Sequence, residues 1–416
     1  MMISLDSNRL WARIEALSRF TRPDQPWTRR AFTPEFAAAR AWLAENFAAS
    51  GLAVSTDAAA NLIGRREGGA PGLAPLVVGS HCDTVPAGGR FDGIAGVATA
   101  LEIAQSFAEA GIALRHPLEV IDFLSEEPSD YGASCIGSRA VVGALTPAML
   151  AARNAGDEPL SAAIERVGGT PGALAEPLRR PGGIAAFLEL HIEQNTVLES
   201  RGEAVGIVTA IVGIHRLRIT VTGRTDHAGS TPMHARHDAL VGAARVIDAA
   251  HRLAREMTGN PDYVVATVGR IAVSPNAANA IPGSAEMILD LRSTSDDVLA
   301  KFPRLLQEAA APGLADMDLA FACELMTRAR PAPCAPEIRE ALARAARAKG
   351  HAALELPSGA GHDAMQIAEI APMGMVFVPC RGGRSHCPEE WAEAADIAAG
   401  AEVLAAALLD LDARLG

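Results

Sequence analysis

The chain lacks the features that mark several large classes of protein. Its six cysteines are scattered over 416 residues and form no CxxC pair, so a disulfide framework is not expected and the thiols are predicted to be reduced. No apolar run reaches the roughly 18–20 residues that a membrane span needs. Positive charge is also scarce, because the net charge is −12, and this argues against a nucleic-acid partner, whose phosphates require clustered Lys and Arg.

A secretory signal is missing as well, since residues 1–20 carry charges throughout and contain no apolar core. Hydrophobic residues make up 49% and charged residues 21% of the chain, the balance of a soluble globular protein. We therefore expect a cytoplasmic protein that binds neither membranes nor nucleic acids. At 416 residues the chain is too long for one ordinary core, so two domains are expected.

The larger part of the chain alternates strand and helix patterns. Short apolar runs typical of buried strands lie at residues 75–80, 117–125, 185–191 and 373–379. Helical patterns lie between or beside them, at residues 33–51, 93–111, from 336 onward, and 392–414. Strands that alternate with helices predict an α/β fold with a mostly parallel sheet covered by helices.

The order of strand and helix patterns is different between residues 212 and 327. There the order of strand and helix patterns is β-α-β-β-α-β, the ferredoxin-like arrangement, and a proline-rich segment at 327–336 leads back to the α/β pattern. We therefore predict a larger α/β domain formed by residues 1–211 and 328–416. A smaller ferredoxin-like α+β domain at residues 212–327 interrupts it.

Histidines and carboxylates collect at the ends of the predicted strands of the larger domain. They are His81, Glu126, Glu127, His191 and His386, and Asp92 opens the helix that follows the first strand. In open α/β sheets the functional crevice lies outside the carboxyl ends of the strands, so these side chains should meet at one edge. Taken singly, each is more simply a capped or solvated residue, and only their convergence favours a site.

The residue types indicate a metal centre. Two adjacent carboxylates at a buried strand end repel each other, which is costly unless a cation lies nearby. Three histidines and two carboxylates would supply mixed nitrogen and oxygen ligands, and a bridging aspartate would hold two metals about 3.5–4 Å apart. One glutamate would remain as a base. Zinc is the first expectation, with manganese, cobalt or nickel as alternatives.

Six motifs in order make the chain similar to a known family. They are GSHCDTVPAGGRFDGIAGV, FLSEEPSDYGASCIGSRA, ELHIEQNTVLE, GRTDHAGSTPMHARHDAL, PNAANAIPGSAEMILDLRS and SGAGHDAMQIA with MVFVPCRGGRSHCPEEW. Together they resemble the M20 metallopeptidase-like amidohydrolases of the hydantoinase/carbamoylase group. That group includes N-carbamoyl-L-amino acid hydrolases, allantoate amidohydrolases and β-ureidopropionases. The resemblance covers nearly the whole chain, including the inserted domain.

The resemblance implies two divalent metal ions per subunit and a role for each strand-end residue. His81 and His191 would hold one metal, Glu127 and His386 the other, and Asp92 would bridge both. The larger domain would then be the catalytic one, and the inserted domain a lid that also forms a homodimer.

Further roles follow from the same resemblance. Asp83 would orient the nearby ligand histidine, and Glu126 would be the general base that moves a proton from the attacking water to the leaving nitrogen. His227, in the inserted domain, would stabilise the tetrahedral intermediate, commonly in a neighbouring subunit's site. Asn279 and Arg292 would bind the substrate's carboxylate, a task that suits the planar guanidinium group.

Three more positions are predicted to contact substrate: His215, Gln194 and Gly361. They lie where the chain departs from the family pattern or in a turn-rich loop. The departures include Ile214 in place of a common glutamine, so they put the substrate's identity in doubt rather than the reaction type.

Some residues keep a structural alternative. Arg292 could equally form a salt bridge with Asp290, and His227 alone would be a solvated loop residue. His362 is kept out of the metal shell as a structural loop histidine, and His116 is expected on the surface because no motif contains it.

The implied function is metal-dependent hydrolysis of a C–N bond in an N-carbamoyl or ureido group of a small molecule that carries a carboxylate. An N-carbamoyl-L-amino acid is the simplest substrate, and allantoate, N-acyl amino acids and dipeptides are the rivals. A non-enzymatic binding protein on the same scaffold is disfavoured, because the base and every ligand are present. A mononuclear hydrolase, with part of the ligand set occupied, stays open.

Overall fold

The structure is a computed structural model that describes residues 5–259 and 261–415. The first four residues of the N-terminal segment considered above therefore lie outside the described residues. The chain divides into two compact units. Unit 1 comprises Met1–Thr209, Cys334–Leu356 and Gly361–Gly416, and unit 2 comprises Ala210–Pro333 and Pro357–Ala360.

A large mixed sheet carries unit 1, in the order β1-β2-β4-β3-β5-β13-β6-β11, with β12 beside β6. The strands are β1 Ala53–Thr56, β2 Leu62–Arg66, β3 Leu76–His81, β4 Leu118–Phe123, β5 Ala186–Ile192, β6 Gly206–Ile211, β11 Ala332–Pro333, β12 Leu354–Ser358 and β13 Met373–Val378. The central strands β4, β3, β5 and β13 are parallel and buried along their whole length. The predicted α/β fold with a parallel sheet is confirmed for this centre, and antiparallel strands flank it.

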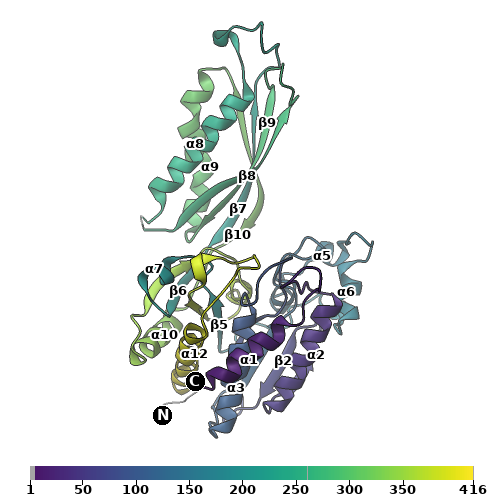
Figure 1. Ribbon diagram of the computed structural model, residues 1–416, viewed down its shortest axis with the longest axis vertical. Helices are drawn as coiled ribbons and strands as arrows, with labels where there is room; N and C mark the ends of the chain where they lie inside the picture. Colours follow the sequence, from purple (N-terminus) through teal and green to yellow (C-terminus); the bar gives the residue numbers. More distant parts are fainter. Residues whose placement is uncertain (1–4, 260, 416) are drawn as a thin grey trace. The chain divides into compact units, whose positions relative to one another are not determined.

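Helices surround the sheet of unit 1 (Figure 1). The longer ones are α1 Ser7–Ser18, α2 Pro34–Ala49, α3 Ile94–Glu109, α10 Pro336–Ala348 and α12 Ala394–Arg414, and the shorter ones are α4 Ile136–Val141, α5 Pro147–Ala151, α6 Leu160–Arg166, α7 Val197–Arg201 and α11 Asp363–Ile367. Single 3₁₀ turns lie at Pro171–Ala173 and Arg381–Gly383, and a third, Met233–Ala235, lies in unit 2. The start of α2 is as expected from sequence, because the Thr33 side chain accepts a hydrogen bond from the Phe36 N–H.

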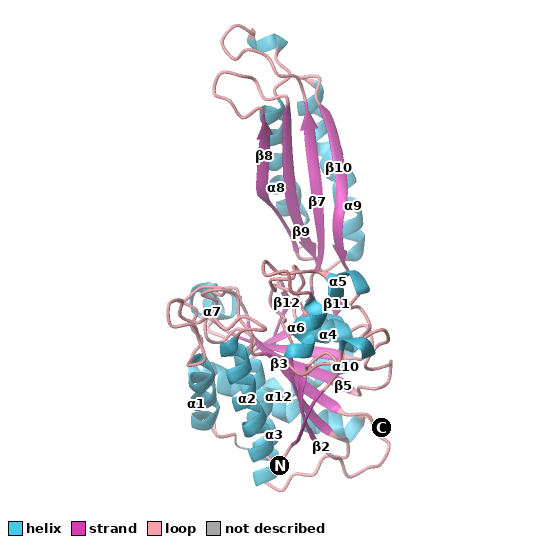
Figure 2. Ribbon diagram, turned by 90° about the vertical axis from the view of Figure 1, so that its right-hand side faces the viewer, coloured by secondary structure: helices cyan, strands magenta, loops and turns pink. Residues whose placement is uncertain are grey.

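Unit 2 has the predicted element order: β7 Gly213–Thr222, α8 Ala239–Met257, β8 Val264–Ser274, β9 Ser284–Ser293, α9 Asp296–Ala315 and β10 Ala320–Ala329. Its four strands are antiparallel in the order β10-β7-β9-β8. Figure 2 shows α8 and α9 on one side of this sheet. Alternate residues of β7 and β9, such as Leu217, Ile219 and Met287, are buried among the helix side chains Val246 and Phe302. This alternation is typical of a sheet with one covered face.

The expected linker at 327–336 is partly strand. β10 continues to Ala329, because it pairs with β7 from Ala320↔Thr222 to Ala329↔Ile214, and β11 follows soon after. The local sequence is rich in proline, so only the partner strand shows that the ladder continues. Strands β1, β2, β6 and β12 were also missed from sequence.

His116 was predicted to lie on the surface, and this was wrong. It is 2% exposed, and its ring nitrogens lie 2.7 Å from the Ala74 carbonyl and 3.1 Å from the Leu415 carbonyl. Both partners come from distant parts of the chain, so no local pattern could reveal them. Among the described residues, no helix is both long enough and apolar enough to cross a membrane.

Candidate metal centre

Elements of unit 1 bring the predicted ligands together at one end of the parallel strands. His81 is the last residue of β3, and His191 lies near the end of β5. Asp92 directly precedes Gly93, which caps α3, while Glu127 follows β4 and His386 follows β13. Because adjacent parallel strands end at the same edge, residues far apart in sequence meet here.

The first group of candidate ligands consists of His81, Asp92 and His191, whose ligand atoms lie within 4.8 Å of one another. The Asp92 Oδ1 atom lies 3.6 Å from His81 Nε2 and 3.3 Å from His191 Nε2. All three side chains are buried. Two imidazoles and a carboxylate oxygen around one point form a set that suits a divalent transition metal.

The second group consists of Asp92, Glu127 and His386. His386 Nε2 lies 3.1 Å from Glu127 Oε1 and 3.3 Å from Asp92 Oδ2. Its side chain is 48% exposed, which makes it the most open of the five predicted ligands. The two oxygens of Asp92 thus face different groups, as a bridging carboxylate requires.

The carboxylates of this cluster favour positive charge on the histidines beside them. Hydrogen bonds to Asp92 and Glu127 raise the pKa of His386 to about 11. Burial lowers the pKa of His191, but the Asp92 charge outweighs it and the pKa rises to about 9. A metal ion binds deprotonated histidine, so a cation would take the place of these protons beside the same carboxylates. The donor set therefore fits two cations.

The Asp83 carboxylate organises the glutamate pair. The main-chain N–H groups of Glu126 and Glu127 donate to Asp83 Oδ1 and Oδ2, each at 3.2 Å. For His81 the nearest partner is the main-chain oxygen of Asp83, 3.1 Å from Nδ1, whereas the Asp83 carboxylate lies at 3.6 Å. The main-chain oxygen of Asp83, rather than its carboxylate, is therefore the closer contact of the His81 ring. The Asp83 side chain positions Glu126 and Glu127 instead.

Glu126 lies beside the first group without belonging to it. Its Oε2 atom is 3.7 Å from His81 Nε2, and the Cys135 thiol donates to its Oε1 atom at 3.5 Å. Burial, and then repulsion from Glu127, raise the pKa of Glu126 well above its ordinary value. A buried carboxyl with a raised pKa next to a reaction centre is suited to carry a proton.

Gly93 is required where α3 begins. Its φ is +67°, and a Cβ at this position would lie 2.4 Å from ring atoms of His81. Any other residue would therefore push the His81 ring aside or strain the backbone.

Two residues of this region have roles that sequence reasoning missed. The ring of His362 lies 4.4 Å from that of His191, and His362 forms a third group of possible ligands with His191 and Glu189. Gln194, predicted to contact substrate, donates from Nε2 to Asp92 Oδ2 at 2.6 Å. The motifs SGAGH and HIEQ contain both residues, but nothing local shows that they face the ligands. Gly361 lies in the same loop as His362, with open space where a Cβ would be.

In unit 2, His227 and Asn279 lie side by side. Ala228 N–H donates to the Asn279 carbonyl at 3.0 Å, and His227 pairs with Ala280 in an isolated bridge. His227 Nδ1 accepts hydrogen bonds from the N–H groups of Gly229 and Ser230, each at 3.1 Å. The neutral ring must therefore carry its proton on Nε2, which makes that atom a donor.

Arg292 lies near the other end of the sheet of unit 2. Its Nε donates to Asp290 Oδ1 at 2.7 Å, so the salt bridge considered from sequence is present, and Nη1 donates to the Gly359 carbonyl at 2.9 Å. Neither contact uses Nη2. His215 is 4% exposed and faces the helices, on the opposite side of the sheet from Arg292. Within unit 2, His215 and Arg292 therefore lie on opposite faces of the sheet.

These features define a class of protein. A sheet whose parallel centre delivers histidines and carboxylates to one shared cluster is typical of a metal-dependent hydrolase. The model of a family described as peptidase family M20/M25/M40 matches residues 77–410. The chain therefore belongs to peptidase family M20/M25/M40.

Individual relatives are similar over nearly their whole length. The N-carbamoyl-L-amino-acid amidohydrolase of Paenarthrobacter aurescens is 40% identical over 413 residues, 98% of each chain. The allantoate amidohydrolase of Bacillus subtilis is 33% identical and covers 91% of this chain and 90% of its own. A crystal structure of an amidase of the hydantoinase/carbamoylase family from Burkholderia multivorans matches 100% of both chains, with a TM-score of 0.91 and 35% identity.

Proposed function

We propose that the protein hydrolyses a C–N bond in the N-carbamoyl group of an N-carbamoyl-L-amino acid. The observation that carries the proposal is the shared Asp92, whose two oxygens face two ligand groups while Glu126 lies beside them. The similarity to an amidohydrolase named for this substrate supports the choice.

The proposed cofactor is a pair of divalent ions, with zinc as the first choice and manganese, cobalt or nickel as alternatives. His81 and His191 would hold one ion and Glu127 and His386 the other, with Asp92 between them. When bound, such a pair polarises a carbonyl and lowers the pKa of a water molecule.

The chain's own residues would move the proton. Glu126 is placed to take a proton from the attacking water and to deliver it to the leaving nitrogen. Asp83 keeps Glu126 in place through its main-chain N–H. The proposed donor to the developing oxyanion is Nε2–H of His227, because Nδ1 already accepts hydrogen bonds.

For the substrate's carboxylate we propose Arg292 and Asn279. Arg292 offers Nη2, while its contacts to Asp290 and Gly359 fix the plane of the guanidinium group.

Unit 2 is proposed to act as a lid and dimerisation domain, because one copy of it cannot supply both ends of a site. Asn279 precedes Ser284 at the start of β9, whereas Arg292 lies near the strand's end. At about 3.3 Å per residue this run of strand is roughly 26 Å long. A single small substrate cannot span that distance, so we propose that Arg292 serves its own subunit and His227 and Asn279 serve the partner.

Exposed apolar residues support a homodimer through unit 2. Ile271 on the edge strand β8 is 45% exposed, and Leu240 and Val241 at the start of α8 are also exposed. The edge strand offers unpaired main-chain groups as well, and such edges are usually protected by a partner. These residues lie toward the end of the sheet that carries His227, since Ala239 N–H donates to the Pro282 carbonyl just before β9.

Mixed dimers test this arrangement. We expect Arg292→Ala and His227→Ala each to be nearly inactive alone, and activity to return when the two variants are expressed together. A heterodimer would then contain one intact site, formed by Arg292 of one subunit and His227 of the other. The measurement is the rate of carbamoyl hydrolysis by heterodimers purified with two different tags.

A heterodimer with no more activity than its parents would place both residues in the same subunit's site and contradict the proposal. A chain that is fully active as a monomer would contradict it as well. His234→Ala is a matched control, because His234 is an exposed histidine in the same segment and should leave activity unchanged.

The main alternative is an allantoate amidohydrolase, because a relative bears that name and allantoate also carries ureido groups and a carboxylate. The deciding experiment is a product assay on metal-loaded protein. The panel contains N-carbamoyl-L- and D-amino acids, β-ureidopropionate, allantoate, N-acyl amino acids and dipeptides. We expect the highest kcat/KM for an N-carbamoyl-L-amino acid. A higher value for allantoate, or turnover of dipeptides alone, would replace the proposal.

A further inference from the structure

A buried glutamate outside the ligand set grips the loop that carries Asp92. Glu390 is 2% exposed, and its Oε1 atom accepts hydrogen bonds from the main-chain N–H of Phe91 at 2.7 Å and of Asp92 at 3.1 Å. These partners are 299 and 298 residues away in sequence. The contact therefore ties two distant segments together directly at the shared ligand.

The other oxygen of Glu390 reaches the same ligand through a hydroxyl group. Ser385 Oγ lies 2.7 Å from Glu390 Oε2 and 2.6 Å from Asp92 Oδ2. Ser385 and Glu390 lie on either side of His386 in the sequence. One short loop thus supplies a candidate ligand and the two side chains that hold the neighbouring ligand.

The backbone opposite Glu390 is shaped to receive it. Gly89 has a φ of +113°, and a Cβ there would lie 2.4 Å from both Cδ and Oε1 of Glu390. A side chain at this position would therefore collide with the carboxylate. This close approach explains why residue 89 of the GGRFDG segment is a glycine, which the metal-ligand assignments do not explain.

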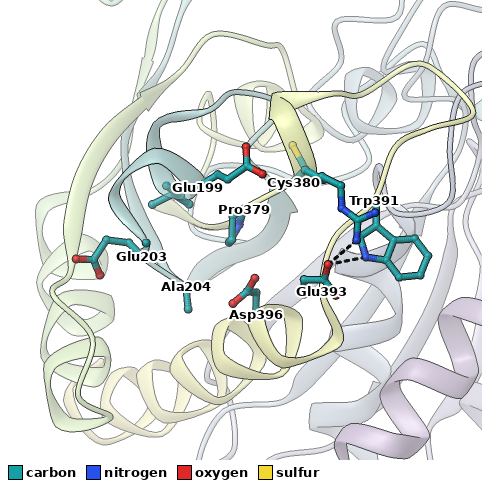
Figure 3. A pocket seen from close by; sticks show the side chains of 11 residues that line it. Glu199, Glu203, Ala204, Pro379, Cys380, Trp391, Glu393 and Asp396 are labelled. Atoms are coloured by element: carbon teal, nitrogen blue, oxygen red, sulfur yellow. Dashed lines mark hydrogen bonds and ion pairs between the residues drawn. The ribbon is translucent and has the colours of Figure 1, made fainter.

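Aromatic packing restrains both segments that form the contact with Glu390. The Arg90 guanidinium carbon lies 4.7 Å from the ring of Trp391 and 4.8 Å from that of Trp27. Trp391 is itself fixed, because its indole N–H donates to Glu393 Oε1 at 2.9 Å, and Figure 3 shows this contact at the wall of a pocket of about 280 Å³. Residues 90 and 391, each next to a member of the contact, are therefore clamped together.

We propose that Glu390 is a positioning residue for the metal centre: with Ser385 it sets the place and orientation of Asp92 so that each carboxylate oxygen faces its own ligand group. The inference rests on the proposed dinuclear centre. A carboxylate has two acceptor oxygens, so one can accept hydrogen bonds from the two N–H groups and the other from the hydroxyl group. An amide has only one acceptor oxygen. Loss of such outer contacts commonly weakens metal binding about 10–100-fold.

The test compares Glu390→Gln and Glu390→Ala with Glu389→Gln in the full-length chain. Glu389 is the adjacent residue of the same type, but it is exposed and pairs with Arg384 at the surface. Metal-free protein is titrated with Zn²⁺ against a chromogenic chelator, and the melting temperature is recorded with and without Zn²⁺. We expect roughly 10–100-fold weaker binding of zinc in both Glu390 variants, a smaller rise in melting temperature on adding zinc, and no change in Glu389→Gln.

A purely structural role would lower the melting temperature of the metal-free protein and leave zinc affinity unchanged, and that result would overturn the proposal. If Glu390→Ala does not fold, Ser385→Ala replaces it, because this change removes only a hydroxyl group. Unchanged zinc affinity in both Ser385→Ala and Glu390→Gln would also overturn the proposal. A wild-type chain that binds no divalent ion would overturn the metal centre together with this inference. Normal wild-type binding with unaffected variants would overturn this inference alone.

Discussion

Replacing Glu126 by glutamine should lower kcat by about 10²–10⁴-fold while the metal content stays at the wild-type level. The change keeps the shape of the side chain but removes its negative charge and its ability to accept and release a proton. Stability should not fall. Burial raises the pKa of Glu126, so at a pH above the ordinary pKa of a glutamate the ionised side chain lowers the free energy of unfolding. Glutamine carries no charge and removes this cost. The measurements are steady-state kinetics and metal analysis on the same preparation.

The neighbouring residue is the matched comparison for this variant. Glu127 lies 3.1 Å from His386 and belongs to the second ligand group, so Glu127→Gln should lose metal as well as activity. The roles of the two adjacent glutamates would then be distinguished by the metal content of the variants, because both variants lose activity. A metal-loaded Glu126→Gln variant with near wild-type turnover would remove Glu126 from the role of base.

Replacing Asp92 by asparagine should reduce kcat/KM by about 10³-fold or more and release metal from both groups. Asp92 is the one residue present in both ligand groups, and an amide offers a single oxygen without charge. Burial opposes ionisation of Asp92, but the charge of His191 and hydrogen bonds from the histidines outweigh it and hold its pKa well below the usual range. The metal-free variant should therefore also lose stability at neutral pH, where the carboxylate is ionised in the folded and unfolded chain.

Metal analysis, kinetics and thermal unfolding measure these effects. Asp130→Asn is the control, because Asp130 is an exposed carboxylate of the same unit that pairs with Arg30. It should match the wild type in all respects. Retention of full metal content by Asp92→Asn would show that the two groups do not share this ligand, and the bridging assignment would then fail.

The candidate ligands could be predicted from sequence because they follow strands with a strong signal. The runs that end at His81 and His191 are apolar and buried along the whole strand, so their ends are easy to locate. Strands β1, β2 and β11 are short and lie in the outer part of the sheet, and they were missed from sequence, as were β6 and β12. His215 is predicted to contact substrate from its position in the family pattern. The alternation of side chains along β7 instead turns it toward the helices of unit 2.

Other outcomes depended on contacts between segments that are far apart. Nothing near Asp83 in sequence shows that its carboxylate accepts from Glu126 and Glu127 rather than meeting the histidine directly. In the same way, the burial of His362 against His191 could not be predicted from the loop alone. Hydrogen bonds of this kind are decided by side-chain geometry after the strands have packed.

The sequence by itself determined the strand ends, the residue types that follow them and the change of rhythm at the inserted domain, because these depend on local periodicity and turn chemistry. The tertiary structure alone decided which oxygen of Asp92 faces which group, and that Glu390 holds the Asp92 loop from 298 residues away. The physical reason is the sheet order β4-β3-β5-β13, which differs from the order along the chain and sets which strand ends become neighbours. Distances of a few ångströms between those ends, and not composition, turn scattered histidines and carboxylates into one centre.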